Sequence, residues 1–111
     1  MAVVSNKPED LVVKICGKLG VRDFFTCIYG PESLNKMKPD PEGLFKFLNM
    51  IGVSSEHSLM VGDSYTDIQA GKSAKCHTCG VLYGIGDTNE LIEERADFYI
   101  RSMEELFQFI D

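Results

Sequence analysis

Several features that mark whole classes of protein are missing from this 111-residue sequence. No apolar run approaches the roughly 20 residues that a membrane-spanning helix needs, and the N-terminus lacks the layout of a signal peptide. Basic clusters are also missing, and the formal net charge is −6, which disfavours binding to nucleic acid or to an anionic membrane surface. Repeats and low-complexity segments are absent. We therefore expect a single domain over residues 1–111, located in the cytoplasm, with neither nucleic acid nor membrane as a partner.

Cysteine is limited to four residues, and their spacing does not complete a metal-binding pattern. Cys76 and Cys79 have the spacing of half a zinc site, but no second pair accompanies them. Cys16 lies on an apolar helical stripe, and Cys27 and Cys79 fall in expected strands, so these three read as small core residues. The two histidines, at 57 and 77, are expected to be ordinary residues near strand starts.

Short apolar runs alternate with longer segments that carry apolar residues at helical spacing. The pattern predicts strands at residues 2–4, 24–29, 59–61, 78–83 and 97–100. It predicts helices at residues 8–19, 41–51, 66–74, 89–95 and 102–110. Strands and helices that alternate over short connections indicate an α/β fold with a mostly parallel sheet.

The expected helices carry matching end signals. Gly20 and Gly52 are natural stops for the first two helices, and Asp40 can cap the second. Ser102 followed by Glu105 is a capping-box pattern for the last helix. The apolar stripes expected to face the core are Leu11, Val12, Ile15, Cys16 and Leu19 in the first helix and Leu44, Phe45, Leu48 and Ile51 in the second.

The most informative segment runs from Ser58 to Asp67, where an apolar run ends in Gly62, Asp63 and Ser64. This pattern predicts a buried strand that leads into a helix. Ligands bind at the carboxyl ends of strands in open parallel sheets, which places Asp63 at such an edge. Asp67 follows one helical turn later on the same side. The two carboxylates suit a hard cation, and we predict Mg²⁺ as the cofactor.

Other strand ends add groups that suit phosphate. Ser5 and Asn6 follow the first strand, and Lys38 lies in a proline-rich loop before the second helix. A hydroxyl, a fixed cation and two carboxylates are what a phosphoryl site with Mg²⁺ requires. Each residue also has an ordinary interpretation: Ser5 as a helix-start residue, Lys38 as a solvated charge and Asp67 as a first-turn acid favoured by the helix dipole.

Together, and in this order, these segments resemble the haloacid dehalogenase superfamily. Residues 5–7 look like its second motif, 38–41 like its third and 61–67 like its fourth. The likeness is greatest to the phosphoglycolate phosphatase group, which residues 80–84 and 96–106 also fit. The resemblance implies a Rossmann-like, three-layer core.

The resemblance also implies roles for the site residues. Ser5 and Lys38 would act in catalysis, and Ser5, Asn6 and Lys38 would bind the phosphorylated substrate. Asp63 would bind Mg²⁺ directly or through water, and Asp67 would orient either the metal shell or Lys38. Lys75 stands where relatives usually have glycine, which suggests a local change in the turn.

One family feature does not occur in this sequence. Members begin with a strand that ends in Asp-x-Asp, whose first Asp attacks phosphorus and whose second acts as acid and base. No such pair occurs in residues 1–111, and the helical cap domain usually inserted before the second motif does not occur either. We therefore expect the C-terminal part of a catalytic core that lacks its central strand. The remaining strands would close up, or a second chain would supply the strand, or the chain would be poorly ordered.

The function expected from this resemblance is Mg²⁺-dependent hydrolysis of a small phosphorylated metabolite, such as phosphoglycolate, through an aspartyl-phosphate. We expect the 111 residues alone not to complete that reaction, because the nucleophile is not among them. The alternative is a non-catalytic module that retains weak affinity for Mg²⁺ or phosphate, or that pairs with another chain. A receiver-type regulatory domain is a third possibility, but no strand carries a phosphoacceptor Asp in the right context.

Overall fold

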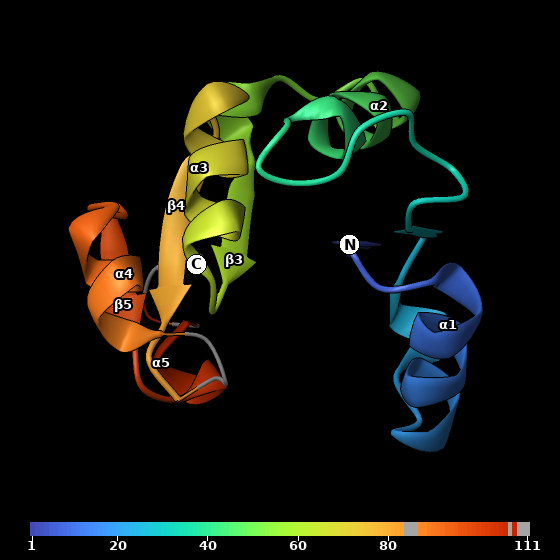
Figure 1. Cartoon of the computed structure of the whole chain (residues 1–111), viewed down its shortest axis with the longest axis horizontal. Coiled ribbons are helices and arrows are strands. Elements are labelled where there is room, and N and C mark those ends of the chain that lie inside the picture. The colour runs from blue at the N-terminus through green and yellow to red at the C-terminus, as the bar shows by residue number, and fades with distance from the viewer. Residues whose placement is uncertain (84–86, 107, 109–111) are drawn as a thin grey trace.

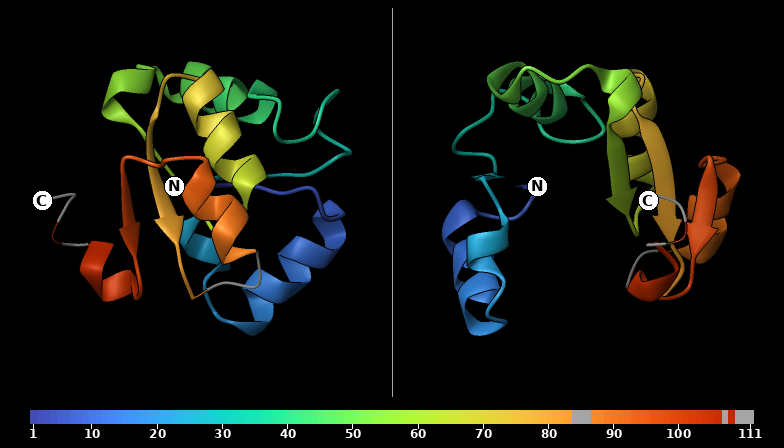
Figure 2. Two further views of the ribbon diagram at one scale, coloured as in Figure 1. Left: turned by 60° about the vertical axis from the view of Figure 1, so that its left-hand side comes forward. Right: turned by 180° about the vertical axis from the view of Figure 1, so that it is seen from behind.

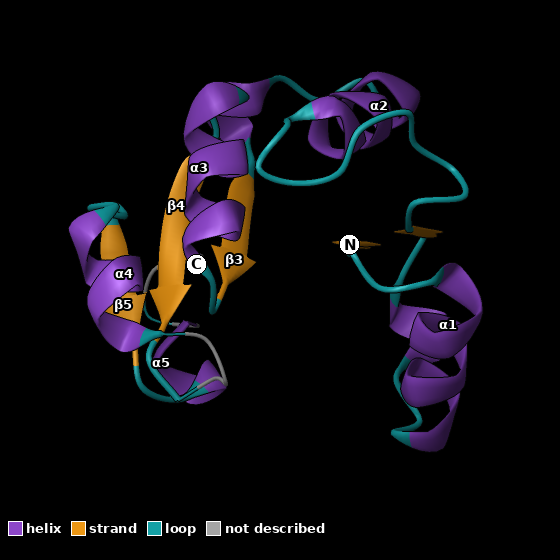
Figure 3. Cartoon of the chain, in the orientation of Figure 1, coloured by secondary structure: helices purple, strands orange, loops and turns teal. Residues whose placement is uncertain are grey.

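The strands form two separate parallel sheets (Figures 1 and 3). The computed structural model describes residues 1–83, 87–106 and 108. Within these residues, β1 (Ala2–Val4) pairs with β2 (Cys27–Tyr29) in one sheet. The second sheet has the order β3 (Leu59–Gly62), β4 (His77–Val81) and β5 (Phe98–Ile100). All three strand pairs are parallel, as predicted for the α/β fold.

Helices follow the strands in the expected alternation. They are α1 (Glu9–Lys18), α2 (Glu42–Ile51), α3 (Tyr65–Ser73), α4 (Thr88–Glu93) and α5 (Met103–Leu106), with 3-10 turns η1 (Arg22–Phe24) and η2 (Ser55–His57). None of the helices described here is long and apolar enough to cross a membrane.

The strand predicted at residues 24–29 is shorter than expected. Phe24 closes the 3-10 turn, and the Phe25 N–H donates to the Arg22 carbonyl at 3.2 Å. The paired strand therefore begins only at Cys27. The last part of the helix predicted at residues 102–110 includes positions 107, 109 and 110, which lie outside the described residues. Glu105 accepts from the Arg101 N–H, one residue earlier than the capping-box pattern predicts.

α3 and α4 lie on one side of the second sheet, and α5 lies near the carboxyl ends of its strands (Figure 2). α3 packs closely over one face: a side chain at Gly71 would meet Met60 and Thr78 at 2.7–2.9 Å, so glycine permits this approach. Leu106 of α5 packs on the opposite face, in a cluster built on Cys79, Val81 and Ile100. This half of the chain therefore has the helix–sheet–helix layering of a three-layer core.

A second apolar cluster connects the two sheets. Leu44 of α2 is buried with Ala70 and Ala74 of the α3 segment, and Val4 of β1 and Met60 of β3 pack against them. α2 therefore lies over the space between the sheets, as Figure 1 shows at the top of the molecule.

The predicted apolar stripes of α1 and α2 are only partly buried. Val12 and Cys16 are buried in α1, and Leu44 and Leu48 in α2, as predicted. The prediction is wrong for the stripe residues that remain exposed: Leu11, Ile15 and Leu19 in α1, and Phe45 and Ile51 in α2. The periodicity identified which residues are apolar. It did not show that, in the described part of the chain, β1 pairs with β2 alone, which offers α1 little surface to cover.

Lys75 follows α3 with φ 61°, in the left-handed region that glycine adopts without strain. A glycine-type turn is thus present at this position although the residue is lysine.

Lys75→Gly should therefore raise the free energy of unfolding by about 0.5–1 kcal/mol, because relief of the strain exceeds the entropy that glycine adds to the unfolded chain. Lys14→Gly, within α1, should instead lower it by about 1 kcal/mol. Urea unfolding of both variants measures the two signs, and a loss of stability in Lys75→Gly would contradict the strain.

Candidate functional site

The end of β1 presents Ser5 with its hydroxyl fixed by the local turn. The Ser5 N–H donates to the Tyr29 carbonyl at 2.9 Å, which extends the pairing of β1 with β2 by one residue. The Ser5 Oγ accepts from the Lys7 N–H at 3.0 Å. Because a hydroxyl has one hydrogen and two lone pairs, this bond leaves the Ser5 O–H able to donate to a ligand.

Asn6 connects the end of β1 to the loop that carries Lys38. Its Oδ1 accepts from the Lys38 N–H at 3.0 Å, and its Nδ2 donates to the Lys38 carbonyl at 3.1 Å. Lys38 precedes a cis peptide bond to Pro39. Within the same loop, Glu42 accepts from the main chain of Asn35 and Lys36, which holds the loop to the start of α2.

The ammonium group of Lys38 forms an ion pair with Asp67. The distance between Lys38 Nζ and Asp67 Oδ1 is 2.5 Å, and the two side chains are only 12% and 8% exposed. The ordinary interpretation of Lys38 as a solvated loop charge therefore does not describe the structure.

Asp67 also caps the helix on which it lies. Its Oδ2 accepts from the Ser64 N–H at 3.1 Å, while the Ser64 Oγ accepts from the Thr66 N–H, so that Ser64 and Asp67 form a capping box. Gly62 provides the space for this arrangement, because a side chain there would collide with the Asp67 carboxylate. The sequence analysis placed Ser64 at the start of the helix but missed its pairing with Asp67, although the Ser-x-x-Asp spacing is itself a signal.

Asp63 follows the last residue of β3 and is half-buried. It lies next to Ser64, and so to the helix end that the Asp67 carboxylate caps. The structure therefore places the predicted residues after two strand ends, β1 and β3, with Lys38 between them. A continuous path of hydrogen bonds runs from Asn6 through Lys38 and Asp67 to Ser64.

The cysteines occupy packing positions. Burial raises the pKa of the Cys79 thiol to about 11 and also raises that of Cys76. Cys79 belongs to the apolar cluster on one sheet face, and Cys76 packs in the other cluster. Across the described part of the chain, no three His, Cys, Asp or Glu residues gather closely enough to hold a metal ion.

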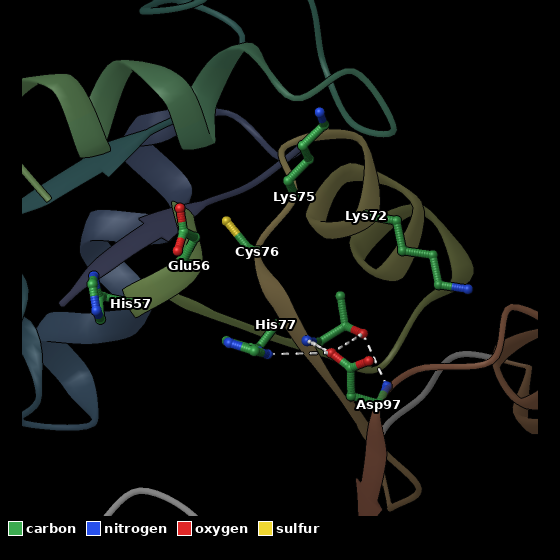
Figure 4. Close-up of a pocket in the computed structure, with 8 residues that line it drawn as sticks. Glu56, His57, Lys72, Lys75, Cys76, His77 and Asp97 are labelled. Atoms are coloured by element: carbon green, nitrogen blue, oxygen red, sulfur yellow. Dashed lines mark hydrogen bonds and ion pairs between the residues drawn. The ribbon is translucent and has the colours of Figure 1, made fainter. Parts of the chain in front are cut away.

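Two surface hollows lie outside this arrangement. The one drawn in Figure 4, of about 600 Å³, lies at the amino ends of β4 and β5, opposite Asp63 at the carboxyl end of β3. Its lining includes His77 and Asp97, whose Nδ1 and Oδ2 atoms lie 3.8 Å apart, and Thr78, whose main-chain N–H donates to Asp97 Oδ2. The other, of about 710 Å³, lies between the outer side of the Lys38 loop and α3. Neither lining includes Ser5, Lys38, Asp63 or Asp67.

The low exposure of the Lys38–Asp67 pair has a measurable consequence. Lys38→Met should lower the free energy of unfolding by about 3–5 kcal/mol, because it leaves the Asp67 carboxylate buried without its cation. Lys36→Met is the matched control: Lys36 pairs with Asp40 at 3.9 Å with its side chain 72% exposed, and its loss should cost at most about 1 kcal/mol. Urea unfolding compares the two, and equal small losses would contradict the buried pair.

The sequence matches known hydrolases over most of its length. The model of the family described as haloacid dehalogenase-like hydrolase matches residues 1–81. A phosphoglycolate phosphatase of Neisseria meningitidis is 37% identical over 97% of this chain and 47% of its own length. Pyrophosphatase PpaX of Listeria welshimeri is 32% identical over 99% of this chain and 51% of its own length.

A solved structure shows the same arrangement of elements. A predicted phosphoglycolate phosphatase from Haemophilus somnus 129pt superposes with a TM-score of 0.93 at 29% identity, over 99% of this chain and 49% of that one. The chain thus spans about half the length of the relatives that it matches. The fold, the order of the motifs and the family match agree: this chain belongs to the haloacid dehalogenase-like hydrolases.

Proposed function

We propose that this chain carries the phosphoryl-binding part of a Mg²⁺-dependent phosphatase that acts on a small phosphate monoester such as phosphoglycolate. The observation that carries the proposal is the placement of Lys38 between the ends of β1 and β3: Asn6 holds its main chain, and Asp67 binds its ammonium group. A fixed cation at strand ends suits the charge that develops on a transferring phosphoryl group. The names of the relatives from Neisseria meningitidis and Haemophilus somnus support this substrate class.

Three residues of this chain would donate hydrogen bonds to the phosphoryl oxygens. The Ser5 O–H would donate to one oxygen, because its Oγ already accepts from Lys7. An ammonium group has three N–H donors, and Asp67 takes one from Lys38, so the others can point to the substrate. Asn6 would contribute its main-chain N–H, since both polar atoms of its side chain bond to Lys38.

The carboxylates present suit Mg²⁺ in kind and number. Mg²⁺ is usually held by one or two carboxylates together with water and substrate phosphate, and needs no cage of protein ligands. Asp67 is committed to Lys38 and Ser64, so Asp63 is the carboxylate that would hold the ion, directly or through water. When bound, the ion would add positive charge beside the phosphoryl oxygens.

The nucleophile of this proposed reaction is an Asp outside the 111 residues, because none of them forms an Asp-x-Asp pair. It would attack phosphorus and displace the alcohol oxygen of the monoester, which leaves protonated, to give an aspartyl-phosphate that water then hydrolyses to phosphate and free Asp. In the described residues β1 pairs only with β2, and β3 only with β4, so each has an open edge. A further strand, from a second chain or a longer form of this one, would satisfy those backbone groups and deliver the nucleophile.

The role of Asp63 predicts a large difference between two isosteric substitutions. The chain would be joined to a segment that carries the Asp-x-Asp strand, and phosphoglycolate hydrolysis measured against Mg²⁺ concentration. Asp63→Asn should lower kcat/KM at least about tenfold, since it removes a metal-binding charge. Asp87→Asn should change little, because Asp87 caps α4 and asparagine caps equally well. Equal losses would show that the metal is held elsewhere. Hydrolysis of pyrophosphate, measured in the same samples, distinguishes phosphoglycolate hydrolysis from the pyrophosphatase activity for which the Listeria relative is named.

The 111-residue chain by itself should show no Mg²⁺-dependent turnover of p-nitrophenyl phosphate above background. Ser5, Lys38 and Asp63 supply charge stabilisation without a group that forms the covalent intermediate. Turnover that survives purification and disappears in Asp63→Asn would mean that another residue of this chain attacks phosphorus.

A further inference from the structure

We propose that Asn6 is a positioning residue, whose side chain holds the main chain of Lys38 so that the ammonium group of Lys38 meets Asp67 at the phosphoryl site. The inference rests on the proposed function for what Lys38 is placed to bind. The placement itself follows from the contacts of Asn6, Lys38 and Asp67.

Both polar atoms of the Asn6 side chain bond to one residue that is 32 positions away in the sequence. The Lys38 N–H can only donate and the Lys38 carbonyl can only accept, which fixes Asn6 Oδ1 as the acceptor and Nδ2 as the donor. The amide therefore pairs with Lys38 as a neighbouring strand would. This arrangement restrains the position and the rotation of the Lys38 backbone together.

Few other side chains can make this pair of bonds. Aspartate has the shape of asparagine but no donor, and it would place an oxygen against the Lys38 carbonyl. Alanine has neither a donor nor an acceptor. Glutamine has both, but its extra methylene displaces the amide from a partner that Asn6 reaches at 3.0 and 3.1 Å.

The loop around Lys38 depends on side-chain hydrogen bonds for its position. From residue 30 to residue 41 it has turns and bends but no strand or helix. The bonds from Glu42 to Asn35 and Lys36 tie the loop to α2, which lies beyond Lys38 in the sequence. The Asn6 bonds tie it to the end of β1, beside Ser5. They therefore set Lys38 relative to the strand end that carries the other phosphoryl-binding group.

Competitive lysine labelling tests this placement without any assay of activity. The 111-residue chain would be methylated with formaldehyde and a borane reductant, and the rate at each lysine read by mass spectrometry. Lys38 should react slowly in the unaltered chain, because its side chain is 12% exposed and ion-paired. Asn6→Ala and Asn6→Asp should each speed labelling of Lys38 about three- to tenfold, since the released loop frees its ammonium group from Asp67.

The other lysines separate positioning from general loosening. The labelling rates of two other lysines should not change. Lys36 lies in the same loop, and Lys72 lies in α3 and donates to the Glu94 carbonyl. Asp67→Asn should speed Lys38 as a positive control, and Asn49→Ala, an exposed change on α2, should not. An unchanged Lys38 rate in Asn6→Ala, or an equal rise at Lys72, would overturn the proposal. Because phosphate hydrolysis is not measured, failure here leaves the proposed function standing, and absent activity leaves this inference standing.

Discussion

The ion pair between Lys38 and Asp67 is the contact on which the rest of the site depends. Each charge is almost fully removed from water, so neither is stable there without the other. Lys38 is attached through Asn6 to the end of β1, and Asp67 through Ser64 to the end of β3. The two sheets share no ladder of hydrogen bonds within the described residues. The same pair therefore places a cation at the site and ties together the strand ends that form it.

The contacts of the second carboxylate oxygen of Asp67 distinguish this residue from Asp63. Asp67 uses it to accept the Ser64 N–H, which sets the start of α3, and Gly62 leaves the space for this contact. With a lysine on one oxygen and a helix cap on the other, Asp67 has two of its roughly four lone-pair positions occupied. Sequence spacing alone could not make this distinction, because both residues follow the same strand. It is the contacts of Asp67 that favour a role in orienting Lys38.

Local pattern predicted the elements well, and it predicted long-range arrangement less well. Every expected strand and helix is present, because apolar periodicity and end signals such as Gly52, with φ 68°, act within one segment. The sequence left open whether the strands would close up where the central strand is missing, and the exposure of Ile15 and Phe45 was not predicted, since both depend on what packs from elsewhere in the fold. The hydrogen-bond partner of Asn6 could not be predicted either, because the sequence alone does not show which main-chain groups a side-chain amide will contact in the fold.

The open strand edges and the candidate site involve the same two strands, β1 and β3. β1 and β3 are the strands whose carboxyl ends carry Ser5 and Asp63, and each of them, like β2 and β5, pairs on one side only in the described structure. Any strand that pairs in parallel with one of these edges ends at the same side of the sheet as its neighbour. Its last residues would then lie beside Ser5 or Asp63. A strand that satisfies the unpaired backbone groups is therefore also placed to bring a reactive side chain to the fixed ammonium group of Lys38.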